Sequence, residues 1–256
     1  PIHKWLPAAM VAPTPVSALL HAVAVVKAGV FSFLMVVVYI IGPDYLLQTR
    51  ASNWLVWLSS FTILAASIIA ISKDDLKARL AYSTISQLSY IILGAALATS
   101  FALKGASFHI ITHAIGKITL FFCAGAIYVT AHVKKISDLG GLGFKTPLIF
   151  FAYTLGALSI IGVPPLVGSW SKAFLVIGSL QADYLFVAIL LGVSSLLNIY
   201  YLLQPVFIAF NKKNIKNIHI TKAPLAVWPP VVTAVGCLLL FFFSNYFLNI
   251  INGVVS

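Results

Sequence analysis

The sequence predicts an all-α polytopic membrane helical bundle of about seven transmembrane spans, and three observations support this prediction. Hydrophobic residues make up 61% of the 256 residues, charged residues make up only 8%, and the mean hydropathy is +1.05. A soluble domain carries about 25% charged residues, because water must wet its surface. Apolar runs long enough to cross a bilayer also recur along the whole chain.

The spans are placed by the length of these runs, since a crossing takes roughly 20 helical residues at about 1.5 Å each. Residues 1–256 are read as a single transmembrane domain. The seven spans are expected near residues 17–42, 53–72, 80–103, 106–131, 147–181, 184–210 and 225–249.

Two of the apolar segments are expected to contain broken helices. The run 147–181 is too long for one straight crossing, and its segment GVPPLVGSW contains Pro164, Pro165 and Gly168, which cannot continue a helix. A similar break is expected at Pro13 to Pro15. Irregular backbone at membrane depth is tolerated only inside protein or beside a wet cavity, so both breaks point to function.

The loop charges support a seven-span count and suggest an orientation. With seven spans, one side of the membrane carries only Arg50 and Lys104, with Lys172 assigned to the second break. The positive-inside rule then places the basic side in the cytoplasm and the C-terminus on the opposite side. The basic side carries Lys4, Lys73, Lys77, Arg79, Lys134, Lys135, Lys145, Lys212, Lys213, Lys216 and Lys222.

Composition also argues against several classes of protein. The net charge of +11 does not indicate nucleic-acid binding, because the bases lie in short loops where lipid headgroups explain them. Cys123 and Cys237 lie in apolar segments without a CxxC pattern, so neither a disulfide framework nor a metal cluster is expected. No flavin, haem, quinone or iron–sulfur pattern is visible, so no cofactor is predicted.

One helix is expected to carry three proton-binding groups along one face. His109, His113 and Lys117 are four residues apart, so they lie in register on a helix, with Thr112 nearby. Histidine titrates near neutral pH and can take a proton on one ring nitrogen and release it from the other. Catalytic zinc is disfavoured, because the chain has no glutamate and no HExxH motif. The spacing favours proton transfer through bridging water.

Two further lysines are candidates for the same chemistry. Lys27 lies too deep in the span 17–42 for its side chain to reach the headgroups, and a lysine held there normally faces protein or water. Lys172 follows the second break, where it is a buried titratable group if the half-helix re-enters the membrane and an interfacial lysine if it does not. Ser17 and His21 are accessory candidates near the first break, although His21 could equally be a packing residue.

The segment KDDLKARLAYSTISQLSY is read more simply. Its charged residues, Lys73 to Arg79, are expected to form a solvated turn.

Four blocks of the chain resemble a known family in order and spacing. They are PIHKWLPAAMVAPTPVSALLHAVAVVKAG, DDLKARLAYSTISQLSYIILG, FHIITHAIGKITLFFCAGAI and LSIIGVPPLVGSWSKAF. They resemble the proton-conducting antiporter-like subunits of respiratory complex I (the L, M and N subunits) and of multisubunit monovalent cation/proton antiporters. The first and third blocks are most similar to the antiporter D-type subunit.

The resemblance implies roles for individual residues. In that family a lysine at the position of Lys27 lies on the proton path, and the central histidines and lysine fall on His109, His113 and Lys117. The family's terminal lysine or glutamate, after the second helix break, falls on Lys172. The family also uses a lysine and a glutamate upstream of the PIHKWLP block. We therefore expect this chain to be the C-terminal half of a longer subunit of an inner membrane, bacterial or organellar.

The function expected from these features is proton translocation, driven by partner membrane subunits of a complex I-like or cation/proton antiporter assembly, with Na⁺ as a possible exchanged ion. The chain itself is not expected to carry a redox or hydrolytic site. Two alternatives stay open: a stand-alone secondary transporter that binds a small substrate at the helix breaks, and a purely structural membrane subunit.

Overall fold

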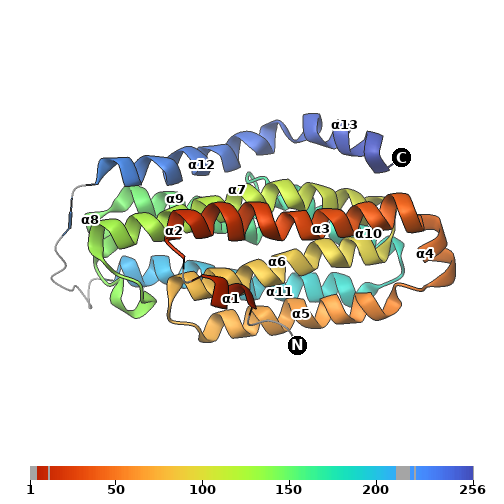
Figure 1. Ribbon diagram of the computed structural model, residues 1–256, viewed down its shortest axis with the longest axis horizontal. Helices are drawn as coiled ribbons and strands as arrows, with labels where there is room; N and C mark the ends of the chain where they lie inside the picture. Colours follow the sequence, from red (N-terminus) through yellow and green to blue (C-terminus); the bar gives the residue numbers. More distant parts are fainter. Residues whose placement is uncertain (1–4, 11, 212–219, 222, 256) are drawn as a thin grey trace.

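Long helices lie side by side along the longest axis of the molecule (Figure 1). The computed structural model describes residues 5–10, 12–211, 220–221 and 223–255. Within these ranges the chain is helical, and the one extended pairing is an isolated bridge between Asp75 and Lys135. The α-helices are α1 (Trp5–Ala9), α2 (Thr14–Val16), α3 (Val25–Met35), α4 (Pro43–Thr49), α5 (Asn53–Ser72), α6 (Leu76–Leu97), α7 (Ser100–Ala131), α8 (Leu142–Lys145), α9 (Pro147–Ile161), α10 (Gly168–Gln181), α11 (Leu185–Ala209), α12 (Pro224–Phe242) and α13 (Ser244–Val255).

The helix lengths agree with a membrane bundle. Among the described residues, five helices are long and apolar enough to cross a membrane: α5, α6, α7, α11 and α12. A sixth span is formed if Val25–Ile41 and Pro43–Thr49 count as one, although they are bent by 79°. Two π-helical stretches, Ser17–Ala24 and Val36–Ile41, extend α3 in both directions. The membrane helical bundle predicted from composition is confirmed.

The second predicted break is present, and the first lies at the start of a helix. The helix α9 ends at Ile161, Gly162 adopts a left-handed conformation with φ of 91°, and α10 begins only at Gly168. Pro13 precedes α2 with extended backbone, and Pro15 falls in the first turn of that helix. Proline is tolerated there, because the first turn has no intrahelical partner for the missing N–H.

Two predicted span boundaries are wrong. The boundary expected between the spans 80–103 and 106–131 lies earlier, because Ala98 takes a left-handed conformation and the Thr99 hydroxyl caps α7 at the backbone N–H of Ala102. Gly105, which falls in the expected gap, is a helix-packing glycine, since a Cβ there would meet the backbone nitrogen of Leu175 at 2.9 Å. The expected span 225–249 is divided at Phe243 into α12 and α13.

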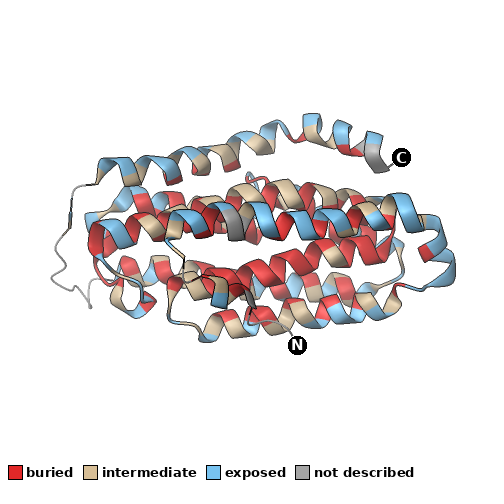
Figure 2. Cartoon of the chain, viewed as in Figure 1, coloured by how far each residue is buried: buried red, intermediate tan, exposed pale blue. Residues whose placement is uncertain are grey.

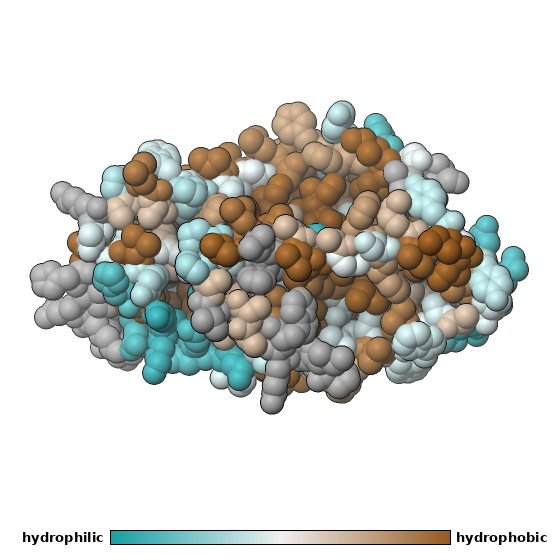
Figure 3. All heavy atoms as spheres, in the orientation of Figure 1, coloured by the Kyte–Doolittle hydropathy of each residue, from teal (hydrophilic) through white to brown (hydrophobic). Residues whose placement is uncertain are grey.

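The helices α6 and α7 form the centre of the bundle. Burial is nearly continuous along α6, whereas α12 and α13 are mostly exposed or half-buried (Figure 2). On the face drawn in Figure 3, hydrophobic side chains cover most of the middle, and hydrophilic ones gather toward the ends of the long axis. Exposed apolar side chains such as Trp54, Trp57 and Val232 belong to this outer surface. On this face the hydrophilic side chains therefore lie toward the ends, while polar residues such as Gln87, His113 and Lys117 are buried in the interior.

The loops at one end of the bundle tie α6 to α7. The backbone N–H of Leu76 donates to the carbonyl of Lys134 at 3.0 Å, and that of Ile136 donates to the carbonyl of Asp74 at 2.8 Å. Burial favours a raised pKa for Asp74, but hydrogen bonds from Ser137 hold its pKa below the ordinary value. This clip fixes the start of α6 relative to the end of α7.

The same end carries the described basic loops. Thr221, just before α12, donates its backbone N–H to the carbonyl of Thr130 at 2.9 Å, which brings the start of α12 to this end. The remaining basic residues counted on this side lie outside the described residues; they are Lys4, Lys212, Lys213, Lys216 and Lys222.

Candidate functional site

The polar stripe predicted on α7 faces the interior of the bundle. His109 is 2% exposed, and His113 and Lys117 are fully buried. The rings of His109 and His113 stack with their centroids 5.8 Å apart, as expected for residues one helical turn apart. The structure therefore brings the three groups into one buried row.

Lys117 is held by the neighbouring helix α6. Its Nζ donates to the hydroxyl of Ser83 at 2.6 Å and to the backbone carbonyl of Leu80 at 3.2 Å. An ammonium in a low-dielectric interior needs such partners, because each N–H left unpaired there costs free energy. The hydroxyl of Tyr201 on α11 lies 3.1 Å from the same Ser83 oxygen.

His109 connects α7 to α10 and α6. Its Nδ1 lies 2.9 Å from the hydroxyl of Ser171, just beyond the second helix break. Its ring stacks on that of Tyr90 with the centroids 5.6 Å apart. The Thr112 hydroxyl lies 3.4 Å from that of Ser171 and 3.3 Å from the carbonyl of His109. The accessory residue Thr112 thus joins the stripe.

Lys172 is buried and lies at the second break. Its Nζ donates to the carbonyl of Ile161 at 2.9 Å and to the hydroxyl of Ser195 at 3.1 Å. The Ile161 carbonyl is accessible because α9 ends there, and helix ends leave carbonyls without intrahelical partners. The ammonium also lies 5.2 Å from the centroid of the Tyr90 ring. The break therefore supplies a partner for the lysine.

Lys27 is buried on the inner face of α3, where it shares a stripe with Val26, Val30 and Leu34. This helix packs against α6 and α7, and Lys27 lies within electrostatic range of His113 and Lys117.

Of the two accessory candidates near the first break, the structure describes the side chain of only one. Ser17 is buried and donates to the carbonyl of Ala12 at 3.2 Å, so it closes the turn at the start of the helix. The side chain of His21 lies outside the described part of the structure.

Sequence reasoning missed Arg79, which was expected in a solvated turn and is only 3% exposed. Its guanidinium donates to the carbonyls of Lys73 (2.9 Å), Tyr201 (3.2 Å) and Ile71 (3.3 Å), and to the Gln204 side chain (2.5 Å). In an unbroken helix the Tyr201 carbonyl would accept from the N–H of residue 205, but Pro205 has none. Arg79 takes the place of that missing donor.

Several buried polar atoms around the stripe have no hydrogen-bond partner among the described residues. They include both ring nitrogens of His113, Nε2 of His109 and both amide atoms of Gln87. Buried polar groups are nearly always satisfied by protein or by ordered water. The geometry therefore suits water between the titratable groups.

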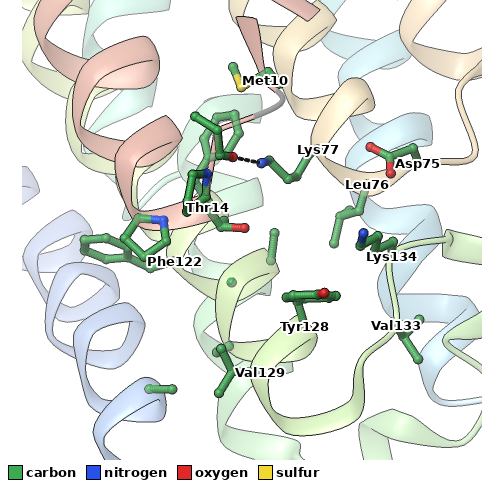
Figure 4. A pocket seen from close by; sticks show the side chains of 18 of the residues that line it. Met10, Thr14, Asp75, Leu76, Lys77, Phe122, Tyr128, Val129, Val133 and Lys134 are labelled. Carbon is green, nitrogen blue, oxygen red and sulfur yellow. Dashed lines mark hydrogen bonds between the residues drawn. The ribbon is translucent and has the colours of Figure 1, made fainter.

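A cavity of about 900 Å³ lies apart from this row, at the basic end of the bundle beside the first break. Its lining includes Pro13, Tyr128 and Lys134, and Lys77, which donates to the carbonyl of Ala12 at 2.7 Å (Figure 4). The five buried lysines and histidines predicted as the proton pathway are not part of its lining.

Comparison with known proteins identifies the family. Residues 1–198 match the family described as NADH:quinone oxidoreductase/Mrp antiporter, TM. The NADH-quinone oxidoreductase subunit N of Desulforudis audaxviator is 39% identical over 217 residues, which cover 83% of this chain and 42% of that protein. Subunit L of Mycobacterium tuberculosis is 36% identical over 245 residues, which cover 92% of this chain and 37% of that protein. The chain thus spans less than half the length of these curated relatives.

Solved structures show the same fold. A chain of the Mrp complex from Dietzia sp. DQ12-45-1b superposes with a TM-score of 0.86 at 21% identity, covering 100% of this chain and 55% of that one. A chain of respiratory complex I from Thermus thermophilus superposes with a TM-score of 0.75 at 24% identity, covering 97% of this chain and 54% of that one. The chain belongs to the family of NADH:quinone oxidoreductase/Mrp antiporter membrane subunits.

Proposed function

We propose that this chain forms part of a proton-translocating membrane subunit, in which protons move through buried lysines, histidines and water. The observation that carries this proposal is Lys117, which is fully buried, bound to the Ser83 hydroxyl, and in line with His113 and His109. The proton pathway comprises Lys27, Lys117, His113, His109 and Lys172.

A row of titratable side chains at the depth of the bilayer core costs free energy, so its presence favours a functional role. A charged side chain at the centre of a bilayer costs at least about 2.5–3.5 kcal/mol, and such residues usually mark ion or proton pathways. The row contains several such groups, and His113 and Gln87 offer buried polar atoms to bridging water. Both features support proton transfer between neighbours rather than a packing role.

The driving force would come from partner subunits. The relatives carry names of NADH-quinone oxidoreductase subunits, and the matched structures are of an Mrp complex and of complex I. We infer that this chain works beside other membrane subunits, driven by electron transfer or by exchange of a cation such as Na⁺. The positive-inside rule would place its basic end in the cytoplasm, in an inner membrane of a bacterium or organelle.

The test uses the full-length subunit in its complex, reconstituted into vesicles, with proton flux as the readout. Lys117→Ala should abolish flux, because it removes the amine that binds Ser83 one helical turn from His113. Lys104→Ala is the matched control in the same helix, since Lys104 is half-buried near its beginning, with its Nζ 5.7 Å from the Phe101 ring centroid. Unchanged flux in Lys117→Ala would contradict the proposal.

A second candidate function has one observation in its favour. The cavity beside Pro13 and Pro15 could accept a small substrate, as a stand-alone secondary transporter requires. That function predicts substrate-dependent flux from the single subunit without partners. It also predicts that Lys117→Ala leaves this flux intact. A purely structural role predicts instead that Lys117→Met retains full proton flux in the assembled complex.

A further inference from the structure

The polar residues of α11 offer a connection between Lys117 and Lys172 that does not pass through the histidines. Asn198 and Tyr201 are fully buried on α11, the Tyr201 hydroxyl reaches Ser83 on α6, and Ser195 lies one turn before Asn198. Residues three apart on a helix share a face. This face therefore presents a hydroxyl, an amide and a second hydroxyl between the two lysines.

The hydrogen bonds at the Lys117 end have a defined direction. The Asn198 side-chain oxygen can only accept, so the Tyr201 hydroxyl donates its single proton to it. The Tyr201 oxygen is then free to accept from the Ser83 hydroxyl, 3.1 Å away, and Ser83 accepts from Lys117 at 2.6 Å. Donors and acceptors thus run head to tail from the ammonium to the amide.

The Lys172 end is completed by Ser195 and by the surroundings of Asn198. Ser195 accepts from Lys172 at 3.1 Å. The Tyr90 hydroxyl lies beside Ser195 and Asn198, although it makes no hydrogen bond of regular geometry with them. The side-chain nitrogen of Asn198 also lacks a partner among the described residues. These groups could hold one or more waters between Asn198 and Ser195.

We propose that Ser83, Tyr201, Asn198 and Ser195 form a second proton route from Lys117 to Lys172, parallel to the route through His113 and His109. The inference rests on the proposed function, because it assigns a further path to the same two lysines. Each step is a proton transfer alone. Every hydroxyl or water accepts one proton and releases another, and the Asn198 amide accepts a proton on Oδ1 and releases one from Nδ2, so only O–H and N–H bonds form and break.

The structure also explains how Tyr201 is held in position. Arg79 binds the carbonyl that Pro205 leaves without a helical partner, and this carbonyl belongs to Tyr201. Arg79 is therefore a positioning residue for the α11 route. It binds the backbone of Tyr201, while the hydroxyl remains available to Ser83.

The experiment compares two single variants and their combination in the full-length, reconstituted complex. With parallel routes, Tyr201→Phe and His113→Leu should each lose part of the proton flux, and the double variant should fall to the level of Lys117→Ala. Tyr153→Phe is the matched control, because Tyr153 is equally buried and lies outside the route. Its flux should remain that of the unmodified complex.

Three outcomes would overturn the proposal. Full flux in Tyr201→Phe would show that its hydroxyl carries no protons. A double variant no worse than His113→Leu alone would show the same. Complete loss in Tyr201→Phe alone would show a single route in series. Assembly and thermal stability of each variant are measured alongside, and Ser83→Ala gives an independent interruption. If Lys117→Ala keeps full flux, the proposed function fails; if only the double-variant pattern fails, the α11 route fails alone.

Discussion

The helices α6 and α12 both reverse the pattern of a soluble protein, in which apolar residues are buried and polar residues are exposed: α6 is buried and comparatively polar, whereas α12 is exposed and apolar. Of the five described helices that are long and apolar enough to cross a membrane, α6 is the most enclosed, with 94% of its most apolar stretch buried, and it is also the least apolar. The helix α12 is the least enclosed, with 17% buried, and is among the most apolar. In lipid, apolar side chains face outward at no cost, so the interior is where polar groups can find partners.

This contrast explains why the functional groups lie where they do. The inner helix α6 contributes Ser83, Tyr90 and Arg79 to the polar network, each facing another helix. The described part of α12 contributes no titratable side chain to it. Removing a polar group should therefore be harmful on α6, and adding one should be harmful on α12. The following variants test this contrast, from the largest expected effect to the smallest.

Removing the buried charge at the start of α6 should give the largest loss of stability. Arg79→Leu leaves three carbonyls and the Gln204 side chain without their donor. Breaking a buried charged network typically costs about 3–5 kcal/mol. Thermal unfolding of the purified subunit in detergent measures the change, and Arg79→Lys should recover part of it. Arg50→Leu, at an exposed position at the other end of the bundle, should change stability by less than about 0.5 kcal/mol. An equal loss of stability in Arg79→Leu and Arg50→Leu would contradict the predicted difference between the buried and the exposed arginine.

Adding a charge to the outer helix should have the next largest effect. Val232 is 65% exposed near the middle of α12. Val232→Lys would place an ammonium against lipid at a cost of about 2.5–3.5 kcal/mol. The membrane-inserted fraction of the subunit should fall, as measured by alkaline extraction of membranes. Val232→Leu should insert like the unmodified chain. Normal insertion of Val232→Lys would mean that α12 faces protein in the assembled complex.

Adding one methyl group to a glycine should have the smallest effect, and this effect should differ between the packed interior and the outer helix α12. A Cβ at Gly178, on α10, would lie 2.3 Å from the backbone nitrogen of Ala102, so Gly178→Ala forces the helices α7 and α10 apart. Such overpacking costs about 1–3 kcal/mol. A Cβ at Gly236, on α12, meets its nearest atom at 3.8 Å, so Gly236→Ala should stabilise the helix by up to about 1 kcal/mol. Midpoints of thermal unfolding compare the pair, and a destabilised Gly236→Ala would place a tight contact on α12.

The sequence predicts the features that depend on local spacing. The four-residue steps from His109 to Lys117 place these groups on one face, and the prolines of GVPPLVGSW mark the break beside Lys172. Lys27 is predicted because a lysine stem is too short to reach the headgroups from its depth. Thr99 marks the true start of α7 as an N-cap residue, whereas the span was expected to begin at residue 106.

Contacts between distant segments could not be predicted in this way. Tyr201 and Ser83 are 118 residues apart in the chain, and nothing in their own neighbourhoods distinguishes them from packing or helix-bonding residues. Arg79 lies among charged residues that do face solvent, such as Asp74. Arg79 fills the gap that Pro205 leaves inside the hydrogen-bond ladder of α11, and this contact is visible only when both helices are placed together. The pattern of a single sequence shows which residues share a face of a helix, but it does not show which residues of two distant helices contact each other.

The pairing of Arg79 with Pro205 has an evolutionary consequence. A relative that replaces the proline regains a backbone donor for the carbonyl at position 201, and its arginine then loses one of its four acceptors. A relative that replaces the arginine strands that carbonyl in the interior. Natural selection should therefore exchange the two positions together, and aligned family members should show them varying as a pair.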